Sequence, residues 1–188
     1  VEVKEMVRMI NKTSEEVYGL LDNLLKWTKS RLGALKVARQ PIRVRELFED
    51  IRDVYAPIAL QKSVALEMEM PEDTEINVDI EMVKSIIRNL ISNAVKFSYE
   101  GGTVHVSCVK RAEGMKIRVS DQGKGIPIAD QDKLLKENTH YTTFGTGNEK
   151  GSGLGLLLCR DFAELHGGKL WFESEEGKGT SFYVFLPS

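Results

Sequence analysis

The chain of 188 residues lacks the features that mark secreted, membrane-spanning and nucleic-acid-binding proteins. Its two cysteines, Cys108 and Cys159, lie far apart inside apolar patterns, so we expect buried reduced thiols rather than a disulfide. The longest apolar run, Leu154 to Cys159, is far too short to span a bilayer, and no signal peptide is visible. The formal net charge of −2 gives no basis for contact with nucleic acid or an anionic membrane. These absences favour a cytoplasmic protein.

The sequence begins at Val1 rather than at a methionine, which indicates a processed chain or a piece of a longer protein. If the parent protein is anchored in an inner membrane, we expect the anchor to lie outside this segment. The content of 41% hydrophobic and 29% charged residues is typical of a globular protein.

No proline occurs before Pro41, and apolar residues from Val3 to about Leu35 recur at alternating steps of four and three. This spacing predicts a bundle or coiled-coil helix of about 30 residues. One helix cannot bury its own apolar stripe, so it needs a partner. The partner is either the rest of this chain or, as we favour, a helical bundle formed across a dimer. Arg39-Gln-Pro41 ends the helix, and we expect a flexible tether there.

The chain from Ile42 onward predicts an α+β fold, a two-layer sandwich with a mixed, mainly antiparallel sheet and helices on one face. Pro57 is expected to kink or end its helix, and Asp79 to cap the next one. The predicted strands are 42–44, 64–68, 76–78, 103–110, 115–120, 169–174 and 180–186, and the predicted helices are 45–62, 79–98, 129–135 and 154–166.

Three short polar motifs interrupt this pattern. The first lies on the helix 79–98, where Asn89, Asn93 and Lys96 share a face about 100° from the apolar stripe. Amide oxygens are suitable Mg²⁺ ligands, and Mg²⁺ usually keeps waters and bridges to substrate phosphates. The alternative is that these three side chains merely face solvent.

The second motif, Asp121-Gln-Gly123-Lys-Gly125, follows a predicted strand. Its glycines allow a sharp turn and the close approach of a flat ligand, and its carboxylate can accept from an exocyclic amine such as adenine N6. The alternative is an Asx-turn that closes a hairpin.

The third motif, Gly151-Ser-Gly153-Leu154-Gly155, opens a helix, where exposed N–H groups and the helix dipole attract phosphate. It is neither a Walker loop nor a dinucleotide fingerprint, and a purely structural helix start is the alternative. The polar stretch 138–150 before it has the composition of a lid over a nucleotide, from which Lys150 could reach a phosphate.

These motifs, in this order, resemble the N, G1 and G2 boxes of the ATP-binding domain of sensor histidine kinases. Gly177-Lys-Gly179-Thr180-Ser-Phe182 resembles the closing motif, whereas the phenylalanine box is poorly matched at Leu135 and Phe144. The resemblance implies an ATP-dependent histidine kinase, with ATP and Mg²⁺ as cofactors and a response-regulator receiver domain as partner.

The resemblance also implies site roles, residue by residue. Asn93 would hold Mg²⁺ with Asn89 in support, and Lys96 and Lys150 would lie near the phosphates. Asp121 would bind adenine, with Gly123 and Gly125 in its loop and Thr180 in its water network. The lid and phosphate site would be lined by Gly151, Gly153, Leu154 and Gly155.

Leu20 to Gly33 resembles the second helix of the family's dimerisation and phosphoacceptor hairpin. The resemblance thus divides the chain into residues 1–38, part of that hairpin and a homodimer contact in the full-length protein, and residues 39–188, the ATP-binding domain. None of the three histidines, His105, His140 and His166, is followed by Asp or Glu or lies on a bundle helix. We therefore assign no phosphoacceptor within this chain.

Other functions share this ATP-binding fold. ATPases that drive chaperones, topoisomerases and mismatch repair use a Glu one turn before the metal-binding Asn as general base, and this chain has Asn89 there. An amide cannot take the proton, which argues against hydrolysis. A serine kinase of the anti-sigma type and a nucleotide-binding or dimerisation module without catalysis remain alternatives.

Overall fold

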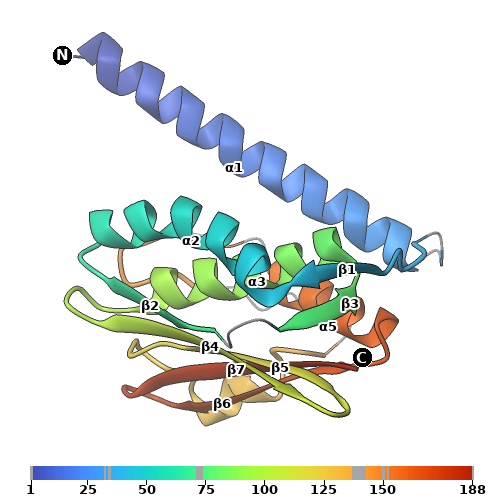
Figure 1. Ribbon diagram of the computed structural model, residues 1–188. Coiled ribbons are helices and arrows are strands. Elements are labelled where there is room, and N and C mark those ends of the chain that lie inside the picture. The colour runs from blue at the N-terminus through green and yellow to red at the C-terminus, as the bar shows by residue number, and fades with distance from the viewer. Residues whose placement is uncertain are drawn as a thin grey trace.

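The computed structural model describes residues 2–31, 33, 35–70, 74–136, 143–149, 151 and 153–187. Figure 1 shows a sheet covered by a layer of helices, with one long helix, α1, running above that layer. The helices are α1 (Glu2–Arg31), α2 (Val44–Gln61), α3 (Ile80–Phe97), α4 (Ile128–Gln131) and α5 (Gly155–Leu165). The strands are β1 (Gln40–Arg43), β2 (Ala65–Glu69), β3 (Glu75–Val78), β4 (Thr103–Arg111), β5 (Gly114–Ser120), β6 (Lys169–Glu175) and β7 (Gly179–Pro187).

The main sheet has five strands in the order β2-β4-β5-β7-β6. Only β2 and β4 are parallel, whereas β4–β5, β5–β7 and β6–β7 pair antiparallel, so the predicted mixed, mainly antiparallel sheet is confirmed. A separate two-stranded sheet joins β1 to β3, with Gln40 opposite Val78. The sequence did not predict this pairing.

The core lies between the sheet and helices α2, α3 and α5. Four of the five stripe residues of α3 are buried, namely Val83, Ile87, Leu90 and Ala94. Asp79 caps α3 as predicted, because its Oδ1 accepts from the Met82 N–H at 3.1 Å. Both cysteines are free and buried, as expected, and burial raises the pKa of the Cys108 thiol to about 12.

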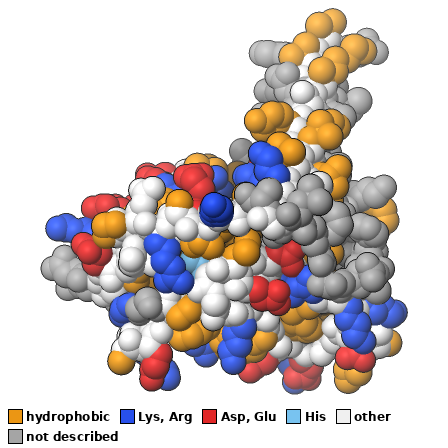
Figure 2. Space-filling model, turned by 90° about the vertical axis from the view of Figure 1, so that its right-hand side faces the viewer, with side chains coloured by type: hydrophobic (Ala, Val, Ile, Leu, Met, Phe, Trp, Pro, Cys, Tyr) orange, Lys and Arg blue, Asp and Glu red, His pale blue; other side chains and the backbone are white. Residues whose placement is uncertain are grey.

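Most of the described apolar side chains of α1 are exposed. Val3, Val7, Ile10 and Tyr18 are 50–75% exposed, and Figure 2 shows hydrophobic side chains along the part of α1 that stands away from the domain. Only its C-terminal end approaches the domain, where it contacts α5. None of the described helices is apolar enough over a sufficient length to cross a membrane.

Three local predictions need correction. Helix α2 covers the predicted range and does not end at Pro57, although a kink there stays a prediction. Pro57 and Asp53 lie on the exposed side of α2, where water can bond the Asp53 carbonyl that Pro57 leaves without a backbone donor. Helix α4 is shorter than predicted, since Lys133 and Leu134 donate to residues three positions back rather than four. The expected tether at 39–41 is not free, because Gln40 and Pro41 belong to strand β1.

Removal of a core side chain on the central strand should destabilise the fold. Ile117 on β5 is fully buried and Ile128 is 86% exposed. We expect Ile117→Ala to lower the free energy of unfolding by about 3 kcal/mol and Ile128→Ala by less than about 0.5 kcal/mol. Denaturant unfolding followed by circular dichroism measures both values, and equal losses would contradict the assignment of the core.

Candidate functional site

The polar face of α3 lies at the margin of the core. Asn89, Asn93 and Lys96 are half-buried beside the buried stripe. The Asn89 Nδ2 donates to the Ser85 carbonyl at 2.9 Å, which fixes the orientation of the amide. Its Oδ1 consequently points at the start of α5, so close to Gly155 that an added Cβ there would lie 2.6 Å from it.

The glycine motif 151–155 lies against this face. An added Cβ at Gly151 would lie 2.8 Å from the Lys96 Nζ, just as Gly155 approaches Asn89. Leu154 is buried and precedes the first residue of α5, and Gly153 has a φ of 72°. The fold therefore brings the first and third motifs together, with a helix N-terminus facing an amide oxygen and an ammonium group. Lys150 lies outside the described residues.

Asp121 lies at the end of β5 and is 7% exposed. Its Oδ1 accepts from the Gly123 N–H at 2.9 Å and from the Thr180 N–H at 3.2 Å. Burial raises the pKa of Asp121 to about 6, although these two N–H groups act to lower it. The described residues provide no hydrogen bond to Oδ2, so that oxygen can accept from a ligand.

Two features of this loop have structural explanations. The Gly123 N–H bond is the Asx-type contact considered as an alternative. Gly125 has a φ of 65° and packs on the Glu175 carbonyl, so a side chain there would be both strained and obstructed. The Thr180 hydroxyl bonds to the Ser174 Oγ at 2.9 Å, so Thr180 reaches Asp121 through its backbone. Its role in a water network stays a prediction.

Two lysines that the sequence did not assign hold the segment 143–149 beside the site. The Lys124 Nζ donates to the Phe144 carbonyl at 2.6 Å and to the Thr143 Oγ1 at 3.1 Å. The Lys62 Nζ donates to the Lys96 carbonyl at 2.5 Å and pairs with Glu149 at 2.8 Å. Lys124 lies inside the second motif, but no sequence signal links the distant Lys62 to the site.

These lysines crowd positive charge around Lys96. Burial lowers the pKa of the Lys96 ammonium, and the charges of Lys124 and Lys62 lower it further, while Glu149 opposes them. Three cations thus surround one carboxylate next to a helix N-terminus. An anion with several negative charges would relieve this repulsion, which a triphosphate chain can do.

A family model described as histidine kinase-, DNA gyrase B-, and HSP90-like ATPase matches residues 78–188. The chain belongs to this ATPase family. The matched range contains all three motifs of the site described above.

Three similar proteins are kinases by name. The adaptive-response sensory kinase SasA of Crocosphaera subtropica is 31% identical over 170 residues, which cover 89% of this chain and 44% of SasA. The full-length kinase ShkA, solved with AMPPNP, has a TM-score of 0.80 at 21% identity and covers 100% of this chain and 40% of ShkA. Histidine kinase ThkA in complex with response regulator TrrA has a TM-score of 0.75 at 20% identity, covering 98% of this chain and 51% of ThkA. The chain is thus similar to the catalytic region of sensor histidine kinases, and it spans less than half the length of SasA.

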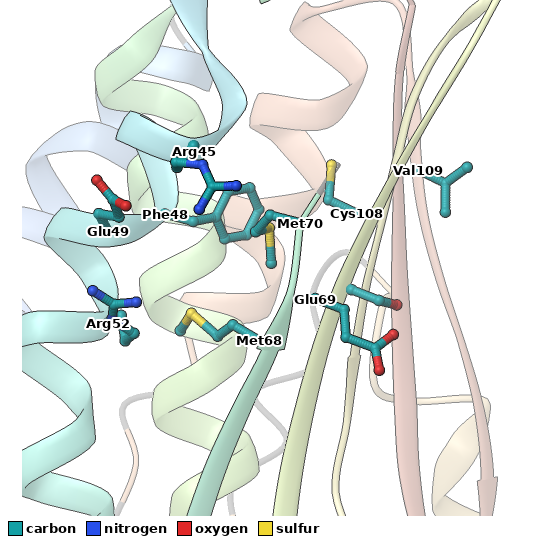
Figure 3. A pocket seen from close by; sticks show the side chains of 10 residues that line it. Arg45, Phe48, Glu49, Arg52, Met68, Glu69, Met70, Cys108 and Val109 are labelled. Carbon is teal, nitrogen blue, oxygen red and sulfur yellow. The ribbon is translucent and has the colours of Figure 1, made fainter. Parts of the chain in front are cut away.

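A cavity of about 440 Å³ lies elsewhere in this domain, between α2 and the β2 edge of the sheet. Figure 3 shows Arg45, Phe48 and Met70 on the helix side, with Glu69 and Val109 on the other side of the strands. None of the predicted site residues lines this cavity. We therefore do not assign this cavity as the nucleotide site, despite its volume.

The titration of Asp121 provides a direct test of its role. In the nucleotide-free domain we expect its carboxyl carbon to titrate near pH 6, as the pKa of about 6 requires. Bound ATP should lower this midpoint, because the adenine amino group donates to the ionised form. Affinity for ATP should correspondingly fall as the pH drops below about 6. Carbon-13 NMR measures the midpoint, and a value near 3.8, or one that ATP leaves unchanged, would contradict the assignment.

The anchoring role of Lys124 is testable by hydrogen exchange. Lys124→Met removes both hydrogen bonds to residues 143 and 144, so amides of 143–149 should exchange about tenfold faster. Lys178→Met is the matched control, because Lys178 lies in an exposed turn and pairs with Glu175. If both variants exchange like the wild type, Lys124 does not anchor the segment.

Proposed function

We propose that this domain binds Mg·ATP and transfers the γ-phosphoryl group to a histidine outside the chain, for relay to an aspartate of a response regulator. The observation that carries the proposal is the position of Asn89. Relatives that hydrolyse ATP have a glutamate there, and a neutral amide bonded to the Ser85 carbonyl cannot activate water. Without a general base to activate water, bound ATP is not hydrolysed and its γ-phosphoryl group remains available to a protein acceptor.

The oxygen donors of α3 fit Mg²⁺. Asn93 would be the ligand, and the fixed Oδ1 of Asn89 would support it from one turn away. Among the described residues no group of three or more His, Cys, Asp and Glu side chains could cage a metal. This suits an ion that is held mainly by phosphate oxygens and water. When bound, Mg²⁺ would neutralise charge on the phosphates.

The remaining site residues bind and orient the nucleotide in this proposal. Lys96 and the N–H groups at the start of α5 attract the phosphates, with Gly151, Gly153, Leu154 and Gly155 forming the loop beside them. Asp121 accepts from adenine through Oδ2. The ShkA structure, solved in complex with AMPPNP, supports nucleotide binding by this fold. Catalysis would come from positioning and charge neutralisation.

The described histidines are unsuited to accept the phosphoryl group. His166 is 1% exposed, its Nδ1 lies 2.7 Å from the Phe162 carbonyl, and its Nε2 accepts from the Asp79 N–H. His105 projects from β4 beside Glu67 and Glu69, on the sheet face away from α3. His140 lies outside the described residues. Because His140 is followed by Tyr141 rather than by Asp or Glu, we propose that the acceptor belongs to another chain or another part of the parent protein.

We further infer that residues 1–38 belong to a dimerisation bundle and residues 39–188 form the ATP-binding domain. The exposed apolar residues of α1 support this division, because a lone helix with such a face requires a partner. The ThkA–TrrA complex supports a response regulator as the onward acceptor. In the full-length protein, Leu21→Glu with Leu25→Glu should convert a dimer into a monomer. Analytical ultracentrifugation tests this, and an unchanged dimer would refute the role of α1.

Phosphoryl transfer is tested with γ-labelled ATP. This chain alone should acquire no stable, acid-labile label. Full-length protein carrying Asn93→Ala cannot use its own ATP, so it should become labelled on histidine only when this chain or the wild type supplies the donor site. Label on this chain alone would show that its acceptor was missed. Release of free phosphate without any labelled protein would favour an ATPase, and neither product would favour the non-catalytic module.

A further inference from the structure

The segment between α1 and β1 is fixed to the ATP-binding domain rather than free. Leu35 and Val37 are half-buried and pack against the core. The Ala38 N–H donates to the Asp79 Oδ2 at 2.9 Å. The same carboxylate caps α3 through its other oxygen, Oδ1. One aspartate thus serves both a helix N-terminus and the incoming chain.

Arg39 fixes the segment at a second helix end. Its Nη2 donates to the His166 carbonyl at 2.8 Å, and its Nη1 donates to the Pro187 carbonyl at 3.3 Å. His166 is the C-cap of α5, where carbonyls lack helical partners and the helix dipole is negative. A guanidinium group at this position both satisfies the carbonyl and opposes the dipole.

The two helix ends are also joined to each other. The Asp79 N–H donates to the His166 Nε2 at 3.1 Å, and the opposite ring nitrogen lies 2.7 Å from the Phe162 carbonyl. His166 is buried, so neither contact competes with bulk water. We call Ala38, Arg39, Asp79 and His166 the linker latch.

Both helices of the nucleotide site reach this latch. Helix α3 begins at Asp79 and carries Asn89 and Asn93 further along, whereas α5 begins at the glycine motif and ends at His166. The segment that follows α1 is therefore attached to the far ends of both site helices. Gly33, with a φ of 64°, is where the chain turns between α1 and the docked segment.

We propose that Arg39 and Asp79 are positioning residues that fix the direction of α1 relative to the ATP site. A role of Arg39 and Asp79 in phosphoryl transfer rests on the proposed function. In that function the ATP site must face the helix that carries the acceptor at a defined distance. The latch itself is a property of the fold and can be tested without ATP. With the latch broken, residues 35–39 would no longer be held on the domain, and α1 would sample a wider range of directions than the turn at Gly33 alone allows.

Distances between spin labels test the proposal. Labels are placed at Ser14→Cys on α1 and Glu113→Cys in the β4–β5 turn, both exposed positions, while the native cysteines are buried. Asp79→Ser keeps a side chain that can cap α3 but is too short to retain the bond to Ala38. Arg39→Met removes the bonds to His166 and Pro187. Arg43→Met is the matched control, since the Arg43 side chain is exposed and forms no hydrogen bond or ion pair with the described residues.

Double electron-electron resonance should give one narrow distance distribution for the doubly labelled chain without further substitutions. The labelled chain that also carries Arg43→Met should give the same distribution. Asp79→Ser and Arg39→Met should broaden the distribution or shift it. The Ala38 amide should also exchange about tenfold faster in Asp79→Ser. Unchanged distributions in both variants would overturn the proposal, as would broadening in Arg43→Met to the same extent.

A second readout separates the latch from the nucleotide site. Mg·ATP affinity, measured by calorimetry, should change less than about twofold in both latch variants, because neither residue belongs to the site. In the full-length protein, the same variants should alter the rate of histidine phosphorylation without altering the KM for ATP. A loss of ATP affinity equal to the loss of rate would instead indicate general destabilisation. If the full-length protein shows no histidine phosphorylation at all, the proposed function is wrong. The spin-label distances would still decide whether the latch fixes α1.

Discussion

The packing of α3 against the sheet is the constraint on which the site depends. Burial of Val83, Ile87, Leu90 and Ala94 fixes the rotation of this helix about its axis. Once that rotation is set, Asn89, Asn93 and Lys96 must lie at the margin of the core, where a polar side chain can be half-desolvated without being isolated from solvent. The apolar stripe therefore positions the amides and the ammonium group of the proposed nucleotide site.

Charge gives the site its preference for an anion. Lys62, Lys96 and Lys124 converge near the N-terminus of α5, and among the described residues Glu149 is the carboxylate that opposes their charge. The net charge of the whole chain conceals this, since a formal −2 is spread over 188 residues. Asp121 lies at the other end of the site, where burial favours contact with a neutral donor such as adenine. The two ends thus match the two ends of ATP.

Local signals in the sequence predicted much of the fold and part of the site. The stripe of α3, the Asp79 cap and the hairpins β4–β5 and β6–β7 follow from periodicity and turn chemistry that act within a few residues. The β1–β3 sheet was missed because it joins segments far apart in sequence, and no local pattern specifies which strands pair.

Tertiary contacts also explain the roles that the sequence left unassigned. Lys62 reaches the site only because α2 and α3 pack together, and Arg39 reaches α5 across most of the chain. The expected flexible tether failed for the same reason, since Pro41 indicates the end of a helix but says nothing about what the following residues contact. Such pairings depend on the assembled fold.

The central claim is that the three motifs form one nucleotide site, and NMR with Mn·ATP tests it most directly. The paramagnetic ion replaces Mg²⁺ and broadens amide signals near the metal. The account predicts the strongest broadening around Asn93 and Gly153, with a smaller shift at Asp121 and no effect at Met70 or Cys108 in the separate cavity. Broadening centred on Met70 and Cys108, with Asn93 unaffected, would contradict it.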